Sequence, residues 1–218
     1  MDLTSTYIRA VKSFEQNCSG CHQEQISSAS LNLFTVPEFE ENPFLPDFYI
    51  DPERYGFQTQ LFFLLQRYRQ QQELRQVDMF QNLLVTDYMF VKDRLFAALN
   101  LNEKEMSLYD SVAKMMEKNI IHPDLVIFLQ ADTETLMKNI SKRGRDFEKN
   151  MSEDYIDALN QVYNEYFFRY QETPLIIINT NNIDFVQNPG DLEEMIGYIR
   201  QPISGTKFFN PSSGLQDA

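Results

Sequence analysis

Two cysteines and a histidine near the start of the chain match a known cofactor chemistry. Cys18, Cys21 and His22 have the spacing of c-type haem attachment, in which two thioethers hold the porphyrin and the imidazole is an axial ligand. Such attachment takes place outside the cytosol. The first 30 or so residues contain no basic segment followed by an apolar one that would indicate export. We therefore favour two unmodified thiols and keep a c-type haem protein as a remote alternative.

A run of basic residues, Lys142, Arg143 and Arg145 around Gly144, suits a different chemistry. A guanidinium is a planar fork of N–H donors, so it can grip several oxygens of a phosphoryl group while charge spreads during transfer. The same run also suits the end of a helix, where positive charge is favourable to the helix dipole. Taken alone, it is better explained as a solvated helix end.

These residues must be positioned by an alternation of short apolar runs and longer helical patterns. Residues 83–86, 125–129 and 175–178 are predicted strands covered on both faces, and 33–36 is a weaker candidate. The predicted helices are 52–76, 102–119, 132–142, 152–170 and 191–200. This alternation predicts an α/β fold with a parallel sheet and right-handed crossovers. Residues 201–218 have little periodicity and are predicted to be a mobile tail.

Four blocks in a fixed order carry a resemblance to a known family. They read EFEENPFLPDFYIDPERYGFQTQ (38–60), DYMFVKDRLFA (87–97), PDLVIFL (123–129) and KRGRDFE (142–148). With these blocks the chain resembles the deoxynucleoside kinases, particularly their bacterial deoxyadenosine and deoxyguanosine kinase branch, over residues 38–200. The resemblance implies a three-layer P-loop-kinase-like (NTP hydrolase) fold with a parallel sheet of about five strands. It places one domain at 1–200, of which 1–37 is atypical.

The resemblance also implies a reaction and an acceptor site. The reaction is transfer of the γ-phosphoryl of ATP, with Mg²⁺, to the 5′-hydroxyl of a deoxynucleoside, with a purine favoured. Tyr49 and Glu148 match the residues that contact the sugar 3′-hydroxyl. Gln60 matches the glutamine that pairs with the base edge, since an amide offers a donor and an acceptor together. Arg67 and Asp93 match the charged pair that borders the base and biases its choice.

For the phosphate side, the resemblance implies a second set of residues. Arg143 and Arg145 match the lid arginines that close over the transferred phosphoryl group. Asp87 is assigned to the catalytic set, although Asp-Tyr-Met stands here where many relatives have Glu-Arg-Ser. Asp184 and Phe185 are the implied cofactor-binding residues, and no residue is assigned to a metal.

Two departures from the family both fall before residue 38. Family members have Gly-x-x-Gly-x-Gly-Lys-Ser/Thr, whose backbone N–H groups cradle the phosphates while its lysine and hydroxyl reach phosphate and Mg²⁺. The matching segment here has a single glycine, Gly20, and the chain has no Gly-Lys-Ser/Thr. Pro37 stands where the family has its general-base glutamate, and Glu38 is one residue further on.

Divergence or a reading-frame shift within codons 9–37 would explain both departures. Shifted one base forward, codons permitted for residues 16–26 can spell Lys-Thr-Ala-Leu-Ala-Ala-Ile-Arg-Ser-Arg, much like the first P-loop helix of a relative. In either case we predict that the chain as written has no kinase activity above background. A non-catalytic nucleoside-binding or dimer-partner subunit is therefore the alternative function.

Charge and hydropathy bear on the partners. The net charge of −13 arises from 19 basic and 32 acidic residues, so the surface repels nucleic-acid backbone and no nucleic-acid partner is expected. No apolar run approaches the roughly 18 to 20 residues of a membrane span, so no membrane partner is expected. The predicted location is cytoplasmic. The resemblance implies a homodimer.

Overall fold

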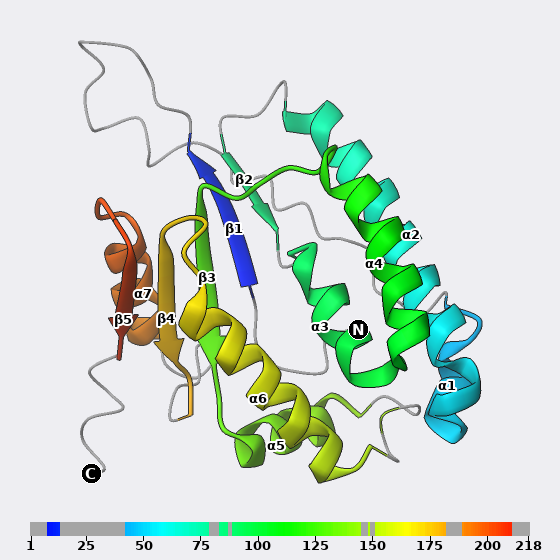
Figure 1. Cartoon of the computed structure of the whole chain (residues 1–218). Coiled ribbons are helices and arrows are strands. Elements are labelled where there is room, and N and C mark those ends of the chain that lie inside the picture. Colours follow the sequence, from blue (N-terminus) through cyan, green and yellow to red (C-terminus); the bar gives the residue numbers. More distant parts are fainter. Residues whose placement is uncertain are drawn as a thin grey trace.

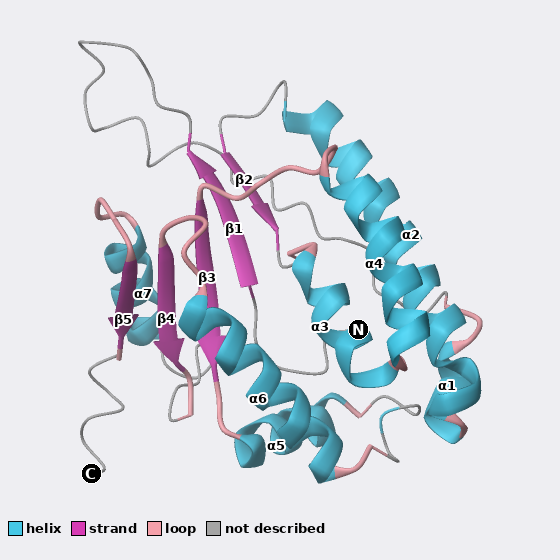
Figure 2. Cartoon of the chain, viewed as in Figure 1, coloured by secondary structure: helices cyan, strands magenta, loops and turns pink. Residues whose placement is uncertain are grey.

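A five-stranded sheet forms the centre of the molecule, with helices packed on both of its faces (Figures 1 and 2). The computed structural model describes residues 8–13, 42–78, 83–86, 89–144, 148, 151–181 and 189–210. The strands are β1 (Ile8–Ser13), β2 (Leu83–Thr86), β3 (Leu125–Gln130), β4 (Leu175–Asn179) and β5 (Thr206–Phe209). The predicted α/β fold is therefore confirmed.

The strand order is β2-β1-β3-β4-β5, and β3, β4 and β5 are parallel to one another. β1 is the exception to the predicted parallel sheet, because it runs antiparallel to both β2 and β3. A right-handed crossover normally fixes the direction of a strand in a parallel sheet. The sequence after β1 lacks the glycine-rich turn that starts such a crossover in the resembled family, so no local signal sets its direction.

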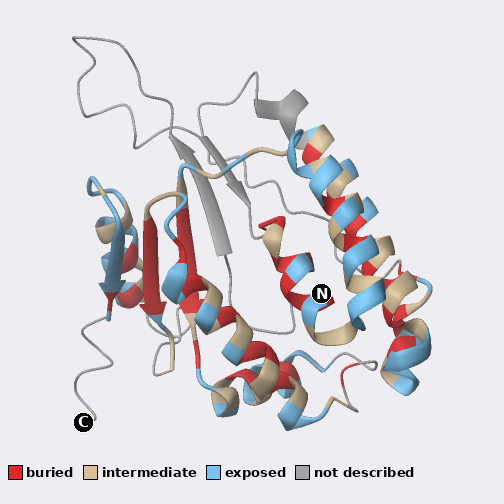
Figure 3. Ribbon diagram, in the orientation of Figure 1, coloured by how far each residue is buried: buried red, intermediate tan, exposed pale blue. Residues whose placement is uncertain are grey.

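The two faces of the sheet carry alternate residues of each central strand. In β3, Val126 and Phe128 belong to a core shared with three helices, whereas Ile127 and Leu129 belong to a second core on the opposite face. The helices over the first face are α3 (Val91–Asn100), α5 (Thr133–Arg143) and α6 (Glu153–Arg169). The opposite face is covered by α7 (Pro189–Ile199). Because both faces are covered, β3 and β4 are buried along most of their length (Figure 3).

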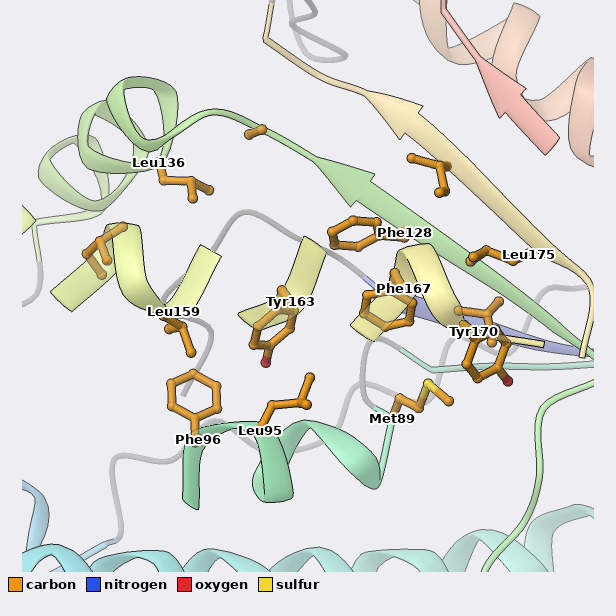
Figure 4. Close-up of a cluster of buried hydrophobic side chains, with 14 of the residues drawn as sticks. Met89, Leu95, Phe96, Phe128, Leu136, Leu159, Tyr163, Phe167, Tyr170 and Leu175 are labelled. Carbon is orange, nitrogen blue, oxygen red and sulfur yellow. The ribbon is translucent and has the colours of Figure 1, made fainter. Parts of the chain in front are cut away.

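Aromatic rings join the sheet to the helices of the first face (Figure 4). Phe128 of β3 stacks on Phe167 of α6 with 4.4 Å between ring centroids, and Phe96 of α3 meets Tyr163 of α6 edge-on at 6.0 Å. Each such pair stabilises the fold by about 0.5–1.5 kcal/mol beyond the area that it buries. The rings therefore fix α3 and α6 relative to the sheet, and α3 is an element of the candidate site.

Side-chain caps begin three of the helices close to where the sequence predicts. Asn102 caps α4 (Glu103–Glu117) in a capping box with Glu105, and Asp132 and Ser152 accept a backbone N–H at the starts of α5 and α6. Gly144 ends α5 with a φ of 69°, a left-handed conformation that favours glycine. The chain can thus turn sharply after Arg143.

The longest helix, α2 (Pro52–Asp78), packs against α1 (Leu45–Ile50), α3 and α4. Its start at residue 52 is confirmed. Gly56 lies where α2 meets the end of α3, and a Cβ atom at this position would lie 3.0 Å from the backbone oxygen of Asn100. The absence of a side chain therefore lets the two helices approach closely.

β5 lies within the segment that was predicted to be a tail. It pairs in parallel with β4, and its Phe209 is buried in the core under α7 while Phe208 is exposed. This finding corrects the predicted domain boundary at residue 200, since the sheet extends to Phe209. Residues 211–218 and the candidate strand 33–36 lie outside the described residues. None of the described helices has the length and apolar character needed to cross a membrane.

Candidate functional site

The buried face of α2 is unusually polar. Residues three or four positions apart form a stripe along it: Gly56, Gln60, Leu64, Arg67 and Gln71. All five are buried, and three of them carry polar or charged side chains. Gln71 accepts from the backbone N–H of Ile121 at 3.2 Å, and Arg67 also has a hydrogen-bond partner. The member that makes this stripe a candidate binding surface is therefore Gln60, because a buried Gln normally has partners.

Gln60 is the clearest sign of a site on this stripe. Its side chain is 1% exposed, and neither the amide nitrogen nor the amide oxygen has a hydrogen-bond partner. An unpartnered buried polar group costs about 1–3 kcal/mol, so such groups are rare in native proteins. A ligand with a donor and an acceptor side by side would remove that cost.

Thr59 is a site candidate that the sequence analysis missed. Its side-chain hydroxyl is buried and without a hydrogen-bond partner, directly beside Gln60 in the chain. No sequence signal distinguishes it, because a helical threonine usually satisfies its hydroxyl with its own backbone. Its unmet hydrogen bond adds to the evidence that this end of α2 faces a ligand.

α3 places Asp93 against the same region. Asp93, in the first turn of α3, is buried, and so is Arg67 on the packed helix α2. The Nη1 of Arg67 donates to Oε1 of Gln70 at 3.0 Å. Burial, together with the negative charges of Asp93 and Asp110, raises the pKa of the Tyr109 phenol on α4. The predicted charged pair thus lies on two helices that contact each other.

Tyr49 reaches the site region through α1. Its ring meets Phe48 edge-on at 5.4 Å, and Leu45 and Phe48 of α1 pack with Phe63 of α2 in a small apolar cluster. This cluster fixes α1 on α2 near the end that carries Gln60. Tyr49 is half-buried. The structure therefore brings Tyr49 onto the same pair of helices as the base-edge glutamine.

Arg143 and Glu148 form a two-pronged ion pair. Nη2 of Arg143 lies 2.7 Å from Oε1 of Glu148, and Nε of Arg143 donates to Oε2 at 3.0 Å. The side chain of Glu148 is only 2% exposed, against 28% for Arg143. The sequence analysis assigned these residues to different parts of the ligand and did not predict their contact.

A second polar cluster lies at the carboxyl ends of β3 and β4, the edge at which α/β proteins commonly bind ligands. Gln130 donates to Asn164 at 2.6 Å, Asn164 donates to Asn160 at 3.1 Å, and Asn160 donates to the backbone oxygen of Ala131 at 3.1 Å. The hydroxyl of Thr180 donates to the backbone oxygen of Gln130 at 2.9 Å. These groups satisfy one another, so the cluster is structural.

Several predicted site residues lie outside the described residues. They are Asp87, Arg145, Asp184 and Phe185, together with the haem-motif residues Cys18, Cys21 and His22 and the positions Pro37 and Glu38. Within the part of the chain that the structure describes, no group of three His, Cys, Asp or Glu side chains is placed to hold a metal ion.

Comparison with known proteins identifies the family. The model of the family described as deoxynucleoside kinase matches residues 11–204. A deoxyguanosine kinase of Bacillus subtilis (strain 168) is 27% identical over 169 residues, which are 75% of this chain and 82% of the relative. A deoxyadenosine kinase of Dictyostelium discoideum is 33% identical over 186 residues, 83% of this chain and 73% of the relative.

A solved structure shares the fold. It is deoxyadenosine kinase from M. mycoides with bound dATP, with a TM-score of 0.65 and 23% sequence identity over 81% of this chain and 91% of that one. The resemblance inferred from the four sequence blocks is thereby confirmed, as is the P-loop-kinase-like architecture.

Proposed function

This chain belongs to the deoxynucleoside kinase family, and we propose on that premise that it binds a purine deoxynucleoside as the phosphoryl acceptor of an ATP-dependent 5′-kinase. The two relatives named above are a deoxyguanosine kinase and a deoxyadenosine kinase, which supports the preference for a purine. The reaction that this site serves is transfer of the γ-phosphoryl of ATP to the 5′-hydroxyl, as part of purine deoxynucleoside salvage.

The observation that carries the proposal is the unpartnered amide of Gln60. A nucleobase edge presents a donor and an acceptor side by side, and one amide can match both. Because both amide atoms are buried without partners in the ligand-free chain, binding a base would restore two hydrogen bonds at once. Thr59 supplies a further hydroxyl beside this amide.

The other acceptor residues take the roles that the family resemblance implies. Arg67 and Asp93 border the base and bias its choice, and their burial on contacting helices supports this assignment. Tyr49 and Glu148 contact the sugar 3′-hydroxyl. Cytoplasmic location remains the expectation.

The part of the proposed site that would hold the phosphoryl donor, ATP, is less complete. Arg143, Arg145 and Asp87 are the proposed residues of phosphoryl transfer, and Asp184 and Phe185 those that hold ATP. The sequence nevertheless lacks Gly-Lys-Ser/Thr and has Pro37 at the general-base position, so its residues do not fit Mg²⁺-ATP as the family holds it. This favours the second candidate function for the chain as written, which is nucleoside binding without turnover.

Titration calorimetry with deoxyadenosine and deoxyguanosine tests the proposal. We expect weak but measurable binding that is lost in Gln60→Ala and kept in Gln66→Ala, a matched change at a half-buried position of the same helix. Binding that survives Gln60→Ala, or no binding of either nucleoside, would overturn the acceptor-site assignment. A turnover assay with ATP then separates the two candidate functions.

A second copy of the chain is the proposed protein partner. The apolar, Met- and Tyr-rich helices around residues 87–109 are the proposed face. On α4, the exposed side chains Leu108, within this range, and Met115, beyond it, are seven residues apart on one side of the helix. We expect a dimer in sedimentation experiments at micromolar concentration. A clean monomer under those conditions would contradict the proposal.

A further inference from the structure

The geometry around residue 144 brings together two residues to which the family resemblance gives separate tasks. Arg143 is the last residue of α5, and Gly144 ends that helix in a left-handed conformation with a φ of 69°. Glu148 lies against Arg143 at the end of α5, and α5 packs against α6 (Figure 1). The lid arginine and the sugar-binding carboxylate are thus direct neighbours.

Burial makes the Glu148 carboxylate depend on compensating contacts, and the contact with Arg143 is one of them. The side chain of Glu148 is 2% exposed, and a buried carboxylate is costly unless a cation and hydrogen bonds compensate it. Nε and Nη2 of Arg143 each bond a different carboxylate oxygen, at 3.0 and 2.7 Å. This parallel arrangement fixes the plane and direction of the carboxylate, which a single contact would leave free to rotate.

The ion pair takes one acceptor position on each oxygen of Glu148, and an ionised carboxylate has about four such positions in all. The geometry of the arginine fork is therefore compatible with a sugar hydroxyl at Glu148 while the ion pair stays intact. By contrast, Arg143 could swing to a phosphoryl group only by leaving a buried negative charge without this partner.

We propose that Arg143 is a positioning residue, which holds Glu148 in the orientation that accepts the 3′-hydroxyl of the bound deoxynucleoside. The inference rests on the proposed function, since it concerns the same acceptor site. It revises the role proposed above for Arg143, from contact with the phosphoryl group to recognition of the sugar, and leaves Arg145 and Asp87 as the proposed residues of phosphoryl transfer. Discrimination between a 2′-deoxynucleoside and its 2′,3′-dideoxy analogue then depends on Arg143 as much as on Glu148.

The experiment compares the affinities of 2′-deoxyguanosine and 2′,3′-dideoxyguanosine by titration calorimetry. For the unmodified protein we expect the deoxynucleoside to bind roughly 10- to 100-fold more tightly, the usual range for a hydrogen bond to a charged group. Glu148→Gln and Arg143→Ala should both reduce this ratio to a similar small value. The double variant should reduce it no further, because the two residues act as one unit.

Two further variants separate positioning from a general loss of structure. Arg143→Lys keeps the charge but not the fork, so we expect it to restore only part of the ratio. Arg94→Ala removes an exposed arginine fork from Asp110, with contacts of 2.8 and 3.1 Å, and should leave the ratio unchanged.

The outcomes separate failure of the inference from failure of the proposed function. A ratio that stays at the unmodified value in Arg143→Ala, with circular dichroism showing a folded protein, overturns the inference alone. If Arg143→Ala does not fold, Arg143→Lys tests the inference. An affinity ratio in the lysine variant equal to that of the unmodified protein shows that the arginine fork is not needed, and overturns the inference. If the unmodified protein binds neither nucleoside, the proposed function fails and the inference fails with it.

Discussion

Two polar regions of this molecule have opposite patterns of hydrogen bonding. At the carboxyl ends of β3 and β4, the amides of Gln130, Asn164 and Asn160 donate to one another and to the backbone in an unbroken chain. On the buried face of α2, the hydroxyl of Thr59 and both amide atoms of Gln60 have no partner. The side chains compared here are all uncharged and polar, and each is buried or partly buried.

The difference separates a structural role from a binding role. A polar network that satisfies itself adds rigidity and has nothing left to offer a ligand. A polar group left unsatisfied lowers the stability of the free protein, and selection tolerates that cost where the group serves function. The position of a polar cluster at the favoured edge of an α/β sheet is therefore a weaker guide to the site than unmet hydrogen bonds.

The largest expected effect comes from restoring the site for the phosphoryl donor, ATP. The nucleoside site on α2 would then lie beside a functional ATP site. Replacing residues 9–30 with a strand, a Gly-x-x-Gly-x-Gly-Lys-Thr loop and a helix, together with Pro37→Glu, should raise phosphorylation of a purine deoxynucleoside from background to a measurable rate. The general base alone accounts for a factor of roughly 10² to 10⁴.

Product formation from labelled ATP measures the rate, and the matched control carries alanine in place of the loop lysine. Turnover by the unmodified chain at ordinary kinase rates would show that another segment holds the phosphates.

The next effect contrasts binding with stability at Gln60. Gln60→Leu replaces the unpartnered amide with an apolar group of similar size, so we expect nucleoside binding to weaken by about tenfold or more. The same change should raise the free energy of unfolding by about 1 kcal/mol, because a buried unsatisfied group is removed. Calorimetry and urea unfolding check the two effects. A loss of stability in Gln60→Leu would mean that the amide is satisfied in the free protein.

Substitution in the self-satisfied cluster at the ends of β3 and β4 should lower the free energy of unfolding, whereas Gln60→Leu should raise it. Asn160→Leu leaves Asn164 and the backbone oxygen of Ala131 without their partner, so we expect a loss of about 1–3 kcal/mol in the free energy of unfolding. Nucleoside affinity in the folded variant should not change. If Asn160→Leu and Gln60→Leu shift the urea midpoint in the same direction, the contrast between the two regions does not hold.

The smallest effect is expected at Thr59. Thr59→Val removes the unpartnered hydroxyl with little change of shape, and should raise the free energy of unfolding by up to about 1 kcal/mol. Nucleoside affinity should fall by about threefold, as expected for loss of one weak hydrogen bond. Thr59→Ser, which keeps the hydroxyl, is the matched control for affinity. Equal affinities in the valine and serine variants would remove Thr59 from the proposed site.

Much of the fold could be predicted because local signals mark it. Asn102, Asp132 and Ser152 cap their helices with side-chain hydrogen bonds, and such residues are recognisable in a sequence. α1 and α3 were not predicted as separate helices, because Phe44 and Phe90 precede them and neither makes a side-chain cap. β5 was not predicted, since its four residues are mostly exposed and its parallel pairing with β4 depends on distant contacts.

The candidate site was predictable to a smaller extent. Four ordered blocks identified the family and the positions Gln60, Arg67 and Asp93, and the structure finds these three residues buried on two packed helices. The ion pair between Arg143 and Glu148 was not predicted, because it depends on how the chain turns at Gly144. Thr59 escaped notice because its unmet hydrogen bond exists only in three dimensions.

Gly56 has a consequence for redesign of base selectivity. It lies one helical turn before Gln60, and a methyl group there would lie 3.0 Å from the backbone oxygen of Asn100, tighter than most such contacts. Gly56→Ala should therefore move α2 away from the end of α3 by a few tenths of an ångström, without changing any polar side chain of the site. Substitution of this glycine would therefore change the distance between the two helices without changing their hydrogen bonds. That makes position 56 a useful target when the protein is selected for nucleosides with larger bases.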